Sequence, residues 1–275
     1  MIENKIYCHD ILGYMNEIAP FLSAESFDNV GLMVGREWAE TKRALVALDC
    51  TEKTIQKAKE IGADLIITHH PLIFSPIKSL REEAFGQNRL IFELIKNDIA
   101  VISSHTCLDT AKGGVADSLA KALRLSSVKE FALSEKSGRF GEALFFGRYG
   151  LLPHEMDFEE LCLFVKDALG ASGIRASNQK GKSFRSLACL GGSGGSFLNE
   201  AFLLNKEGKA DCFVTSDVKH DQWISAQEAG ITLIDAGHFE TERVVINPLT
   251  KALQERFEEV SFVSFFEETS PYVYK

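Results

Sequence analysis

The segment Ala63-Asp-Leu-Ile-Ile-Thr-His-His-Pro-Leu-Ile-Phe74 decides the fold. Its apolar run Leu65-Ile-Ile67 is rich in β-branched residues and predicts a buried strand. His69 and His70 follow the strand. Successive residues of extended chain point to opposite faces, so both imidazoles reach one point only if the backbone bends, and Pro71 favours a bend there. Two neutral imidazoles are good ligands for a divalent transition metal, although they could also be ordinary loop histidines.

The surrounding sequence alternates between predicted strands and predicted helices. Apolar runs predict strands, and apolar residues at helical spacing predict the helices between them. The strands are expected at 43–49, 65–67 and 99–105, and the helices at 51–61, 88–96 and 114–123. This alternation is typical of βαβ units, so we predict an α/β fold with a mostly parallel sheet.

The second half of the chain repeats the first. Ala210-Asp-Cys-Phe-Val-Thr-Ser-Asp217 matches residues 63–70 position by position, at an offset of 210 − 63 = 147. The run Thr232-Leu-Ile-Asp-Ala-Gly-His238 matches the strand that ends in His105. The shared order of several elements predicts two similar α/β lobes, residues 1–130 and 131–275, which face each other across a cleft.

Polar residues follow the predicted strands in both halves. Ligands of open α/β sheets bind outside the carboxyl ends of the parallel strands, so these residues are the candidates for a site. They are His69, His70, Asp109, Ser216, Asp217, His238 and Glu242. Imidazole and carboxylate together suit Zn, Fe, Mn, Ni or Co.

Several of these candidates also have ordinary interpretations. His238 and Glu242 could simply begin a helix, and Asp109 could be a helix N-cap. His105 could be a metal ligand, a partner of a ligand or a group that meets substrate. His220 could orient a ligand or lie on a solvated helix start. His9 and His154 are expected at the surface.

The glycine-rich run Gly191-Gly-Ser-Gly-Gly-Ser196 precedes a predicted helix. Backbone N–H groups at a helix start can bind a phosphate, which would make Ser193 and Gly194, together with Asp217, substrate-binding residues. The run matches neither the dinucleotide fingerprint nor the P-loop, so a tight strand-to-helix turn is an equally good interpretation.

Charge and composition exclude several classes of protein. The 275-residue chain has a net charge of −9 and a pI of about 5.4, which argues against a general nucleic-acid or anionic-membrane binder. A nucleotide substrate is still compatible, because a metal brings positive charge. No apolar run approaches the length needed to cross a bilayer. The N-terminus lacks a signal-peptide core and the six cysteines are scattered, so we expect reduced thiols and a cytoplasmic protein.

Six motifs together resemble one known family. They are D-N-V-G-L from Asp28, T-H-H-P-L-I-F from Thr68, S-H-T-x-L-D from Ser104, the glycine-rich run, T-S-D-V-K-H from Thr215 and D-A-G-H-F-E-T-E from Asp235. Over nearly the whole chain, the sequence is similar to the NGG-interacting factor 3-like family, also called the GTP cyclohydrolase 1 type 2 family. Many members have Gly where Ser216 stands, and some longer members carry an inserted domain for which this chain is too short.

The resemblance implies a site with two divalent transition-metal ions. The ligands that it implies are His69, His70, Asp109, His238 and Glu242. It also implies a cytoplasmic homo-oligomer, expected to be a hexamer. The strand predicted at 260–266 has aromatic residues on both faces, so it should be central in a sheet or at a subunit contact.

Two metal ions suit hydrolysis, because together they activate water and hold phosphoryl oxygens. We therefore expect a metal-dependent hydrolase that acts on a nucleotide or another phosphorylated small molecule. Glu242 is the first choice for a carboxylate that bridges the ions, and His105 for a general acid or base. The alternative is a metal-binding regulatory or interaction protein without turnover. The sequence alone does not separate the two.

Overall fold

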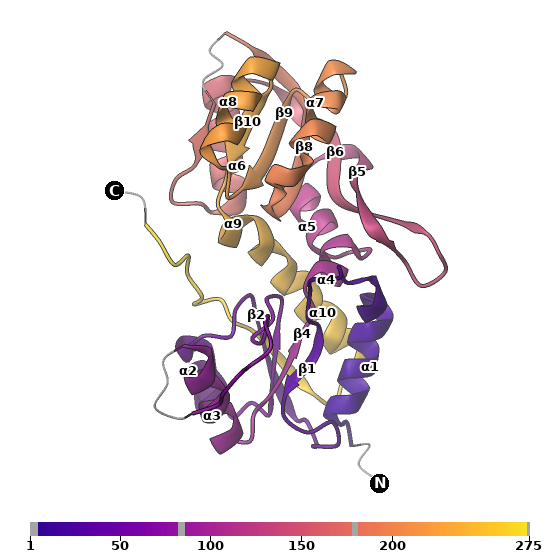
Figure 1. Ribbon diagram of the computed structural model, residues 1–275, viewed down its shortest axis with the longest axis vertical. Coiled ribbons are helices and arrows are strands. Elements are labelled where there is room, and N and C mark those ends of the chain that lie inside the picture. The colour runs from indigo at the N-terminus through magenta and orange to yellow at the C-terminus, as the bar shows by residue number, and fades with distance from the viewer. Residues whose placement is uncertain (1–4, 82–85, 178–180, 274–275) are drawn as a thin grey trace. The chain divides into compact units, whose positions relative to one another are not determined.

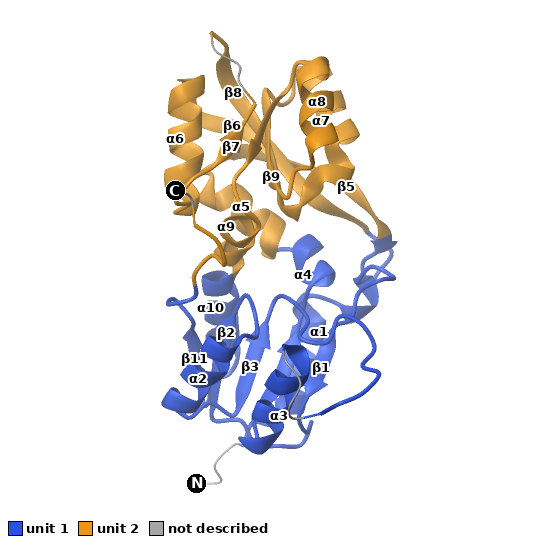
Figure 2. Cartoon of the chain, turned by 60° about the vertical axis from the view of Figure 1, so that its left-hand side comes forward, with its two compact units in different colours: residues 1–112, 136–142, 246–268 blue, residues 113–135, 143–245, 269–275 orange. Residues whose placement is uncertain are grey.

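The computed structural model describes residues 5–81, 86–177 and 181–273. These residues form two compact units, coloured separately in Figure 2. Unit 1 comprises residues 1–112, 136–142 and 246–268, and unit 2 comprises residues 113–135, 143–245 and 269–275. Each unit is an α/β structure built on one sheet, which confirms the predicted fold class. In the described part of the chain, no helix is long and apolar enough to cross a membrane.

The sheet of unit 1 has five strands in the order β1-β4-β3-β2-β11. Four strands are parallel, and β1 runs antiparallel to β4. The bounds are β1 Gly31–Val34, β2 Arg43–Ala47, β3 Leu65–Thr68, β4 Ala100–Ser103 and β11 Ser261–Ser264. The antiparallel β1 therefore begins at the edge of the sheet where β2, β3 and β4 end.

Helices cover both faces of this sheet (Figure 1). Leu45, Ile66 and Val101 point to the face covered by α2 and α3, where they pack in one apolar cluster. Side chains alternate along a strand, so their neighbours point to the opposite face, beside α1 and α10. The helices are α1 Cys8–Ile18, α2 Glu52–Ile61, α3 Gln87–Lys96, α4 Thr106–Thr110 and α10 Ile246–Arg256, with the short 3-10 helix η1 Phe21–Ser23.

Helix α2 shows why these segments start and stop where they do. Thr51 caps its N-terminus, and its hydroxyl accepts a hydrogen bond from the backbone N–H of Thr54 at 3.2 Å. Gly62 ends it in the left-handed conformation, with φ of 65°, which a residue with a side chain rarely adopts. The next strand, β3, follows three residues later, so the short connection fixes where the two histidines emerge.

The sheet of unit 2 has six strands in the order β5-β6-β8-β9-β10-β7. Strands β8, β9 and β10 are parallel, while β6 and β7 pair antiparallel with β8 and β10. Their bounds are β5 Ser126–Ser137, β6 Ala143–Asp157, β7 Arg175–Ala176, β8 Ser183–Ser193, β9 Cys212–Ser216 and β10 Thr232–Asp235. The sequence did not predict the long strand β5, because its apolar residues lack a regular alternation.

Two helices cover each face of the unit 2 sheet. Leu119 and Leu161, from α5 and α6, pack on one face, and Leu198 and Ala226, from α7 and α8, pack on the other. The helices are α5 Val115–Ala122, α6 Phe158–Leu169, α7 Leu198–Lys206, α8 His220–Ala229 and α9 His238–Glu242, with the 3-10 helices η2 Gly194–Phe197 and η3 Arg243–Val245.

The internal repeat is visible in the strand register. Ile66 pairs with Leu45 and Val101, and its counterpart Phe213 pairs with Ala188 and Leu233. After the third strand of each repeat, β4 in unit 1 and β10 in unit 2, the sequence match and the structural match differ by one residue. Thr68 lies opposite Ser103, and Thr215 lies opposite Asp235, so the residue equivalent to His105 is Gly237 rather than His238. His105 accordingly caps α4, whereas His238 is the first residue of α9.

The last strand returns to unit 1. β11 pairs with β2 at the edge of the sheet, so the predicted strand at 260–266 is not central. Phe265 is buried against the α2–α3 face, at 7% exposure, while Phe266 is 65% exposed. The division predicted from the sequence, 1–130 and 131–275, does not take this return into account, because pairing between distant segments leaves no local signal.

Phe265 and Phe266 provide a matched test of this packing. Phe265→Ala should lower the free energy of unfolding by about 3–5 kcal/mol, because it leaves a cavity in the unit 1 core. Phe266→Ala should change it by less than about 0.5 kcal/mol. Urea unfolding followed by circular dichroism measures both. Equal effects of the two substitutions would contradict the observed face of β11.

Candidate metal centre

Three histidines of unit 1 gather at the carboxyl ends of neighbouring strands. His69 and His70 follow β3, and His105 follows β4, whose last residues are paired as Thr68 with Ser103. One ring nitrogen from each histidine lies within 4.8 Å of the others. The ring centroid of His69 lies 4.9 Å from that of His70 and 5.3 Å from that of His105. The predicted bend after Thr68 therefore brings both rings of the double histidine to one place.

Each of these rings is held at Nδ1 by an oxygen atom. The partner of His69 is the backbone carbonyl of Ser104, at 3.0 Å. The partners of His70 and His105 are carboxylates of Asp49 and Asp28, each at 2.8 Å. A carbonyl and an ionised carboxylate only accept hydrogen bonds, so Nδ1 must carry the proton in every ring. Nε2 then keeps its lone pair, which is the arrangement found in histidines that ligate metals.

The sheet topology explains where the two carboxylates come from. Asp49 lies two residues after β2, at the same edge of the sheet as the histidines. Asp28 precedes the antiparallel β1, whose first residue, Gly31, pairs with Ser103. The sequence singled out Asp28 only as the start of a family motif and did not single out Asp49, because these contacts depend on which strands are neighbours.

A further carboxylate holds the end of β2 in place. Glu268 is buried and accepts hydrogen bonds from the backbone N–H groups of Leu48 and Asp49, at 2.8 and 2.9 Å. Burial raises the pKa of Glu268, and the neighbouring charge of Asp49 acts in the same direction. Glu268 thereby fixes the backbone from which Asp49 reaches His70. Sequence reasoning missed it, because it lies 219 positions from Asp49.

Asp28 and His105 shift each other's pKa. Burial of Asp28 acts to raise its pKa, but hydrogen bonds with His105 and Thr106 and the charge of His105 outweigh burial and lower it to about 2. Burial of His105 acts to lower its pKa, but the hydrogen bond to Asp28 and the charges of Asp109 and Asp28 raise it. Asp28 therefore stays ionised and keeps a proton on His105.

Asp109 completes the cluster in unit 1. It lies in α4, which begins directly after His105, and one turn of helix turns its carboxylate back toward β3. Its Oδ1 lies 3.4 Å from Nε2 of the fully buried His69. The structure thus brings together His69, His70, His105 and Asp109, and adds Asp28 and Asp49 as the residues that orient the rings. The predicted roles of these residues as ligands and catalyst stay predictions.

Unit 2 carries a second, smaller set of donors. His238 and Glu242 lie one turn apart in α9, and Nε2 of His238 lies 3.0 Å from Oε2 of the buried Glu242. Nδ1 of His238 is 2.6 Å from the Asp217 carboxylate. The contact that the structure gives Asp217 is therefore one that orients His238, in the same way that Asp28 orients His105. Its predicted role in binding substrate stays a prediction.

The glycine-rich run packs against these donors. A side chain at Gly192, which has φ of +64°, would collide with Oε1 of Glu242 and lie 3.3 Å from Nε2 of His238. A side chain at Gly194 would collide with the Thr215 hydroxyl, to which the Gly194 N–H donates a hydrogen bond at 2.9 Å. Ser193 is exposed at the end of β8. These glycines permit the close approach of neighbouring side chains, which supports the tight-turn interpretation.

The other sequence candidates lie apart from these clusters. His220 is exposed at the start of α8, and His9 and His154 are also exposed. Ser216 is buried and donates a hydrogen bond to the Gly192 carbonyl at 2.5 Å. Burial raises the pKa of the Cys8 thiol to about 11 and that of Cys50 to about 12, so these thiols stay protonated.

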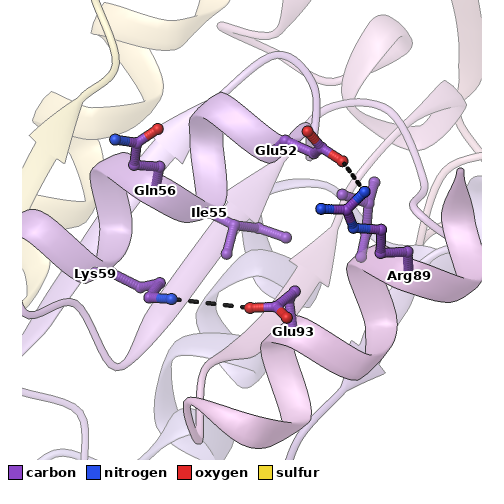
Figure 3. Close-up of a pocket in the computed structure, with 7 residues that line it drawn as sticks. Glu52, Ile55, Gln56, Lys59, Arg89 and Glu93 are labelled. Carbon is purple, nitrogen blue, oxygen red and sulfur yellow. Dashed lines mark ion pairs between the residues drawn. The ribbon is translucent and has the colours of Figure 1, made fainter. Parts of the chain in front are cut away.

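A shallow groove on unit 1 lies between α2 and α3 (Figure 3). Its charged side chains are paired across the groove, Glu52 with Arg89 at 3.5 Å and Lys59 with Glu93 at 3.8 Å. The groove lacks imidazole donors among its lining residues, so it is a poorer candidate for chemistry than the histidine cluster.

The donor sets fit divalent transition metals. Unit 1 presents three Nε2 lone pairs and one carboxylate, and unit 2 presents one Nε2 lone pair and one carboxylate. A lone pair on Nε2 of His238 and a carboxylate oxygen 3.0 Å away repel each other unless a cation or a second ring proton lies between them. Mixed imidazole and carboxylate ligands match the predicted choice of Zn, Fe, Mn, Ni or Co.

Comparison with known proteins identifies the family. Residues 6–271 match the model of the Duf34/NIF3 (NGG1p interacting factor 3) family. This chain belongs to that family. The match confirms the resemblance inferred from the six motifs.

Relatives match this chain over most of their own length. The GTP cyclohydrolase 1 type 2 homolog of Clostridium perfringens is 35% identical over 265 residues, which cover 96% of this chain and 98% of the relative. The GTP cyclohydrolase 1 type 2 of Helicobacter pylori is 33% identical and covers 85% of this chain and 86% of its own. A Bacillus cereus protein related to NIF3 has the same fold, with a TM-score of 0.90, 24% identity and coverage of 98% and 99%.

Two glycines of unit 2 test the packing of the glycine-rich run. Gly192→Ala should displace Glu242 and weaken metal binding about 10- to 100-fold, the usual effect of disturbing the groups around a ligand. Gly170→Ala is the matched control, because Gly170 has the same φ of +64° but open space around it. Isothermal titration of metal-free protein with Zn²⁺ measures both. An equal loss in the two variants would show that backbone strain alone matters.

Proposed function

We propose that this protein is a divalent-metal-dependent hydrolase that acts on a nucleotide or another phosphorylated small molecule. The observation that carries the proposal is the set of Nδ1 hydrogen bonds, which orient Nε2 of His69, His70 and His105 as lone-pair donors. Ring orientation of this kind is energetically unfavourable when no ion is bound, because it brings nitrogen lone pairs and carboxylate oxygens close together, where they repel one another. It supports a metal centre better than a structural role.

The proposed ligands are the five residues implied by the family resemblance. Unit 1 supplies His69, His70 and Asp109, and unit 2 supplies His238 and Glu242. That both sets act on the same two ions stays part of the proposal.

Bound divalent ions would supply positive charge for activating water and for holding phosphoryl oxygens. The residues of the chain would transfer protons and orient the ligands. Asp28 holds a proton on Nδ1 of His105, which leaves Nε2 to take up or deliver a proton as general base or acid. Asp49 and Glu268 keep His70 in place, and Asp217 does the same for His238. Glu242, which is buried, is the proposed bridging carboxylate.

Substrate, assembly and location complete the proposal. Ser193, Gly194 and Asp217 are retained as proposed substrate-binding residues. We also propose a cytoplasmic homo-oligomer, in the form of a hexamer, to which the edge strand β11 can contribute because an edge strand presents unpaired backbone groups. The names of the relatives make GTP the first substrate to test. The alternative is a metal-binding regulatory or interaction protein, which the buried ligand set also permits.

Metal content gives the first test. Purified protein reloaded with Zn²⁺ or Mn²⁺ should hold about two ions per chain, and His69→Ala or Glu242→Ala should reduce that number by about one or more. His154→Ala, which replaces an exposed histidine, is the control and should leave it unchanged. Elemental analysis measures all three. Full metal content in both ligand variants would overturn the proposed centre.

His105 gives the test that separates the two functions. Metal-loaded protein is assayed with GTP and a panel of phosphoesters. If His105 is a general acid or base, His105→Ala should reduce turnover about 100- to 10,000-fold and leave metal content unchanged. Loss of metal in this variant would make His105 a ligand instead. Absence of turnover in wild-type protein with every metal and substrate would favour the non-catalytic alternative.

A further inference from the structure

Two aromatic side chains extend the histidine cluster of unit 1 toward solvent. The Phe74 ring meets the His105 ring edge-on, with centroids 6.3 Å apart and an interplanar angle of 80°. The Phe27 ring follows at 6.4 Å from Phe74, tilted by 52°. The three rings form a continuous wall that starts at a candidate catalytic side chain. We call Phe27 and Phe74 the aromatic wall.

Both phenylalanines of the aromatic wall are exposed. Phe27 is 64% exposed and Phe74 is 48% exposed. Exposure of one large apolar side chain is ordinary, but two such rings in contact beside a cluster of catalytic type are typical of a ligand-binding surface. The tilt between them leaves ring faces open rather than stacked on each other.

The chain segments that carry the wall are tied together. The Asn29 side chain donates a hydrogen bond to the Ile73 carbonyl at 2.5 Å, which joins the turn of Phe27 to the residue before Phe74. Asp28, next to Phe27, accepts hydrogen bonds from the backbone N–H and the hydroxyl of Thr106, at 3.0 and 2.5 Å. The wall is therefore positioned relative to His105 in part by Asp28, the residue that orients the His105 ring. A surface held in this way is prepared to bind before its ligand arrives.

We propose that the aromatic wall binds a planar aromatic ring of the substrate, such as a nucleobase, by stacking. This inference rests on the proposed function and narrows it. A substrate whose phosphoryl group lies at the histidines and that extends past His105 meets the exposed rings of Phe74 and Phe27. Base–aromatic stacking favours any base, because each has a π face. The proposal therefore selects nucleotides over phosphorylated sugars.

Two probe ligands distinguish binding through the aromatic ring from binding through the phosphate. Guanosine 5′-monophosphate and ribose 5-phosphate carry the same phosphorylated ribose, and only the first has an aromatic ring. Metal-loaded protein is titrated with each by calorimetry. Wild-type protein should bind guanosine 5′-monophosphate more tightly. Phe27→Ala should weaken its binding about 5- to 150-fold and leave that of ribose 5-phosphate unchanged.

Further variants show that the aromatic ring itself matters. Phe27→Trp keeps a ring and should retain affinity for guanosine 5′-monophosphate, whereas Phe27→Leu keeps an apolar side chain without a ring and should lose it. Phe266→Ala removes a phenylalanine of nearly equal exposure, 65%, beyond the opposite edge of the unit 1 sheet, and should change neither affinity. Urea unfolding confirms that each variant is folded.

Several results would overturn the inference. Equal binding of both probes to wild-type protein, or equal loss of both in Phe27→Ala, removes the stacking role but leaves the proposed function standing. A change in oligomer mass by light scattering in Phe27→Ala, with nucleotide affinity intact, would assign the wall to a contact between copies of the chain. If neither probe binds metal-loaded protein, the proposed function fails and the inference fails with it.

Discussion

The hydrogen bond at Nδ1 of each candidate ligand histidine is the interaction on which the site depends. An imidazole can rotate about two bonds and can carry its proton on either nitrogen, so an unsupported ring is a poor ligand. A carbonyl or carboxylate at Nδ1 fixes both the rotamer and the tautomer. His69, His70, His105 and His238 all have such a partner, although the partners come from different elements. The same device in both units points to one kind of chemistry.

Strand order supplies those partners. Parallel β2, β3 and β4 end at one edge of the unit 1 sheet, where Asp49, the double histidine and His105 emerge. The antiparallel β1 starts at that edge, so the turn before it delivers Asp28. Gathering carboxylates around imidazoles in a partly buried place is unfavourable unless positive charge compensates them. Burial acts to lower the pKa of His105, but the hydrogen bond to Asp28 and the charges of Asp109 and Asp28 raise it.

The glycine-rich run at 191–196 has a packing role, whereas its sequence pattern suggested phosphate binding. A run of four glycines and two serines before a helix is typical of a phosphate-binding turn. In this protein, Gly192 and Gly194 are small because Glu242 and Thr215 occupy the space that a side chain would need. The run is therefore part of the support for the carboxylate in α9. Any contact of its exposed residue Ser193 with substrate is additional to that role.

The α/β class, the internal repeat and the candidate ligands could all be inferred from the sequence. These features are local or periodic: an apolar run followed by His69 and His70, and a matching apolar run followed by Ser216 and Asp217, 147 positions later. The family followed from six short motifs. Each of these signals lies within a few neighbouring residues, so it can be read without knowing which strands pair.

The surroundings of the candidate ligands became known only from the folded structure. The sequence did not show that Glu268 fixes the backbone of Asp49, that Asp217 orients His238, or that β11 returns to pair with β2. It also placed His238 one residue out of step with its structural counterpart. The physical reason is the same in each case: hydrogen bonds between segments far apart in the chain depend on strand order and register, which pairing over the whole sheet sets and no local pattern records.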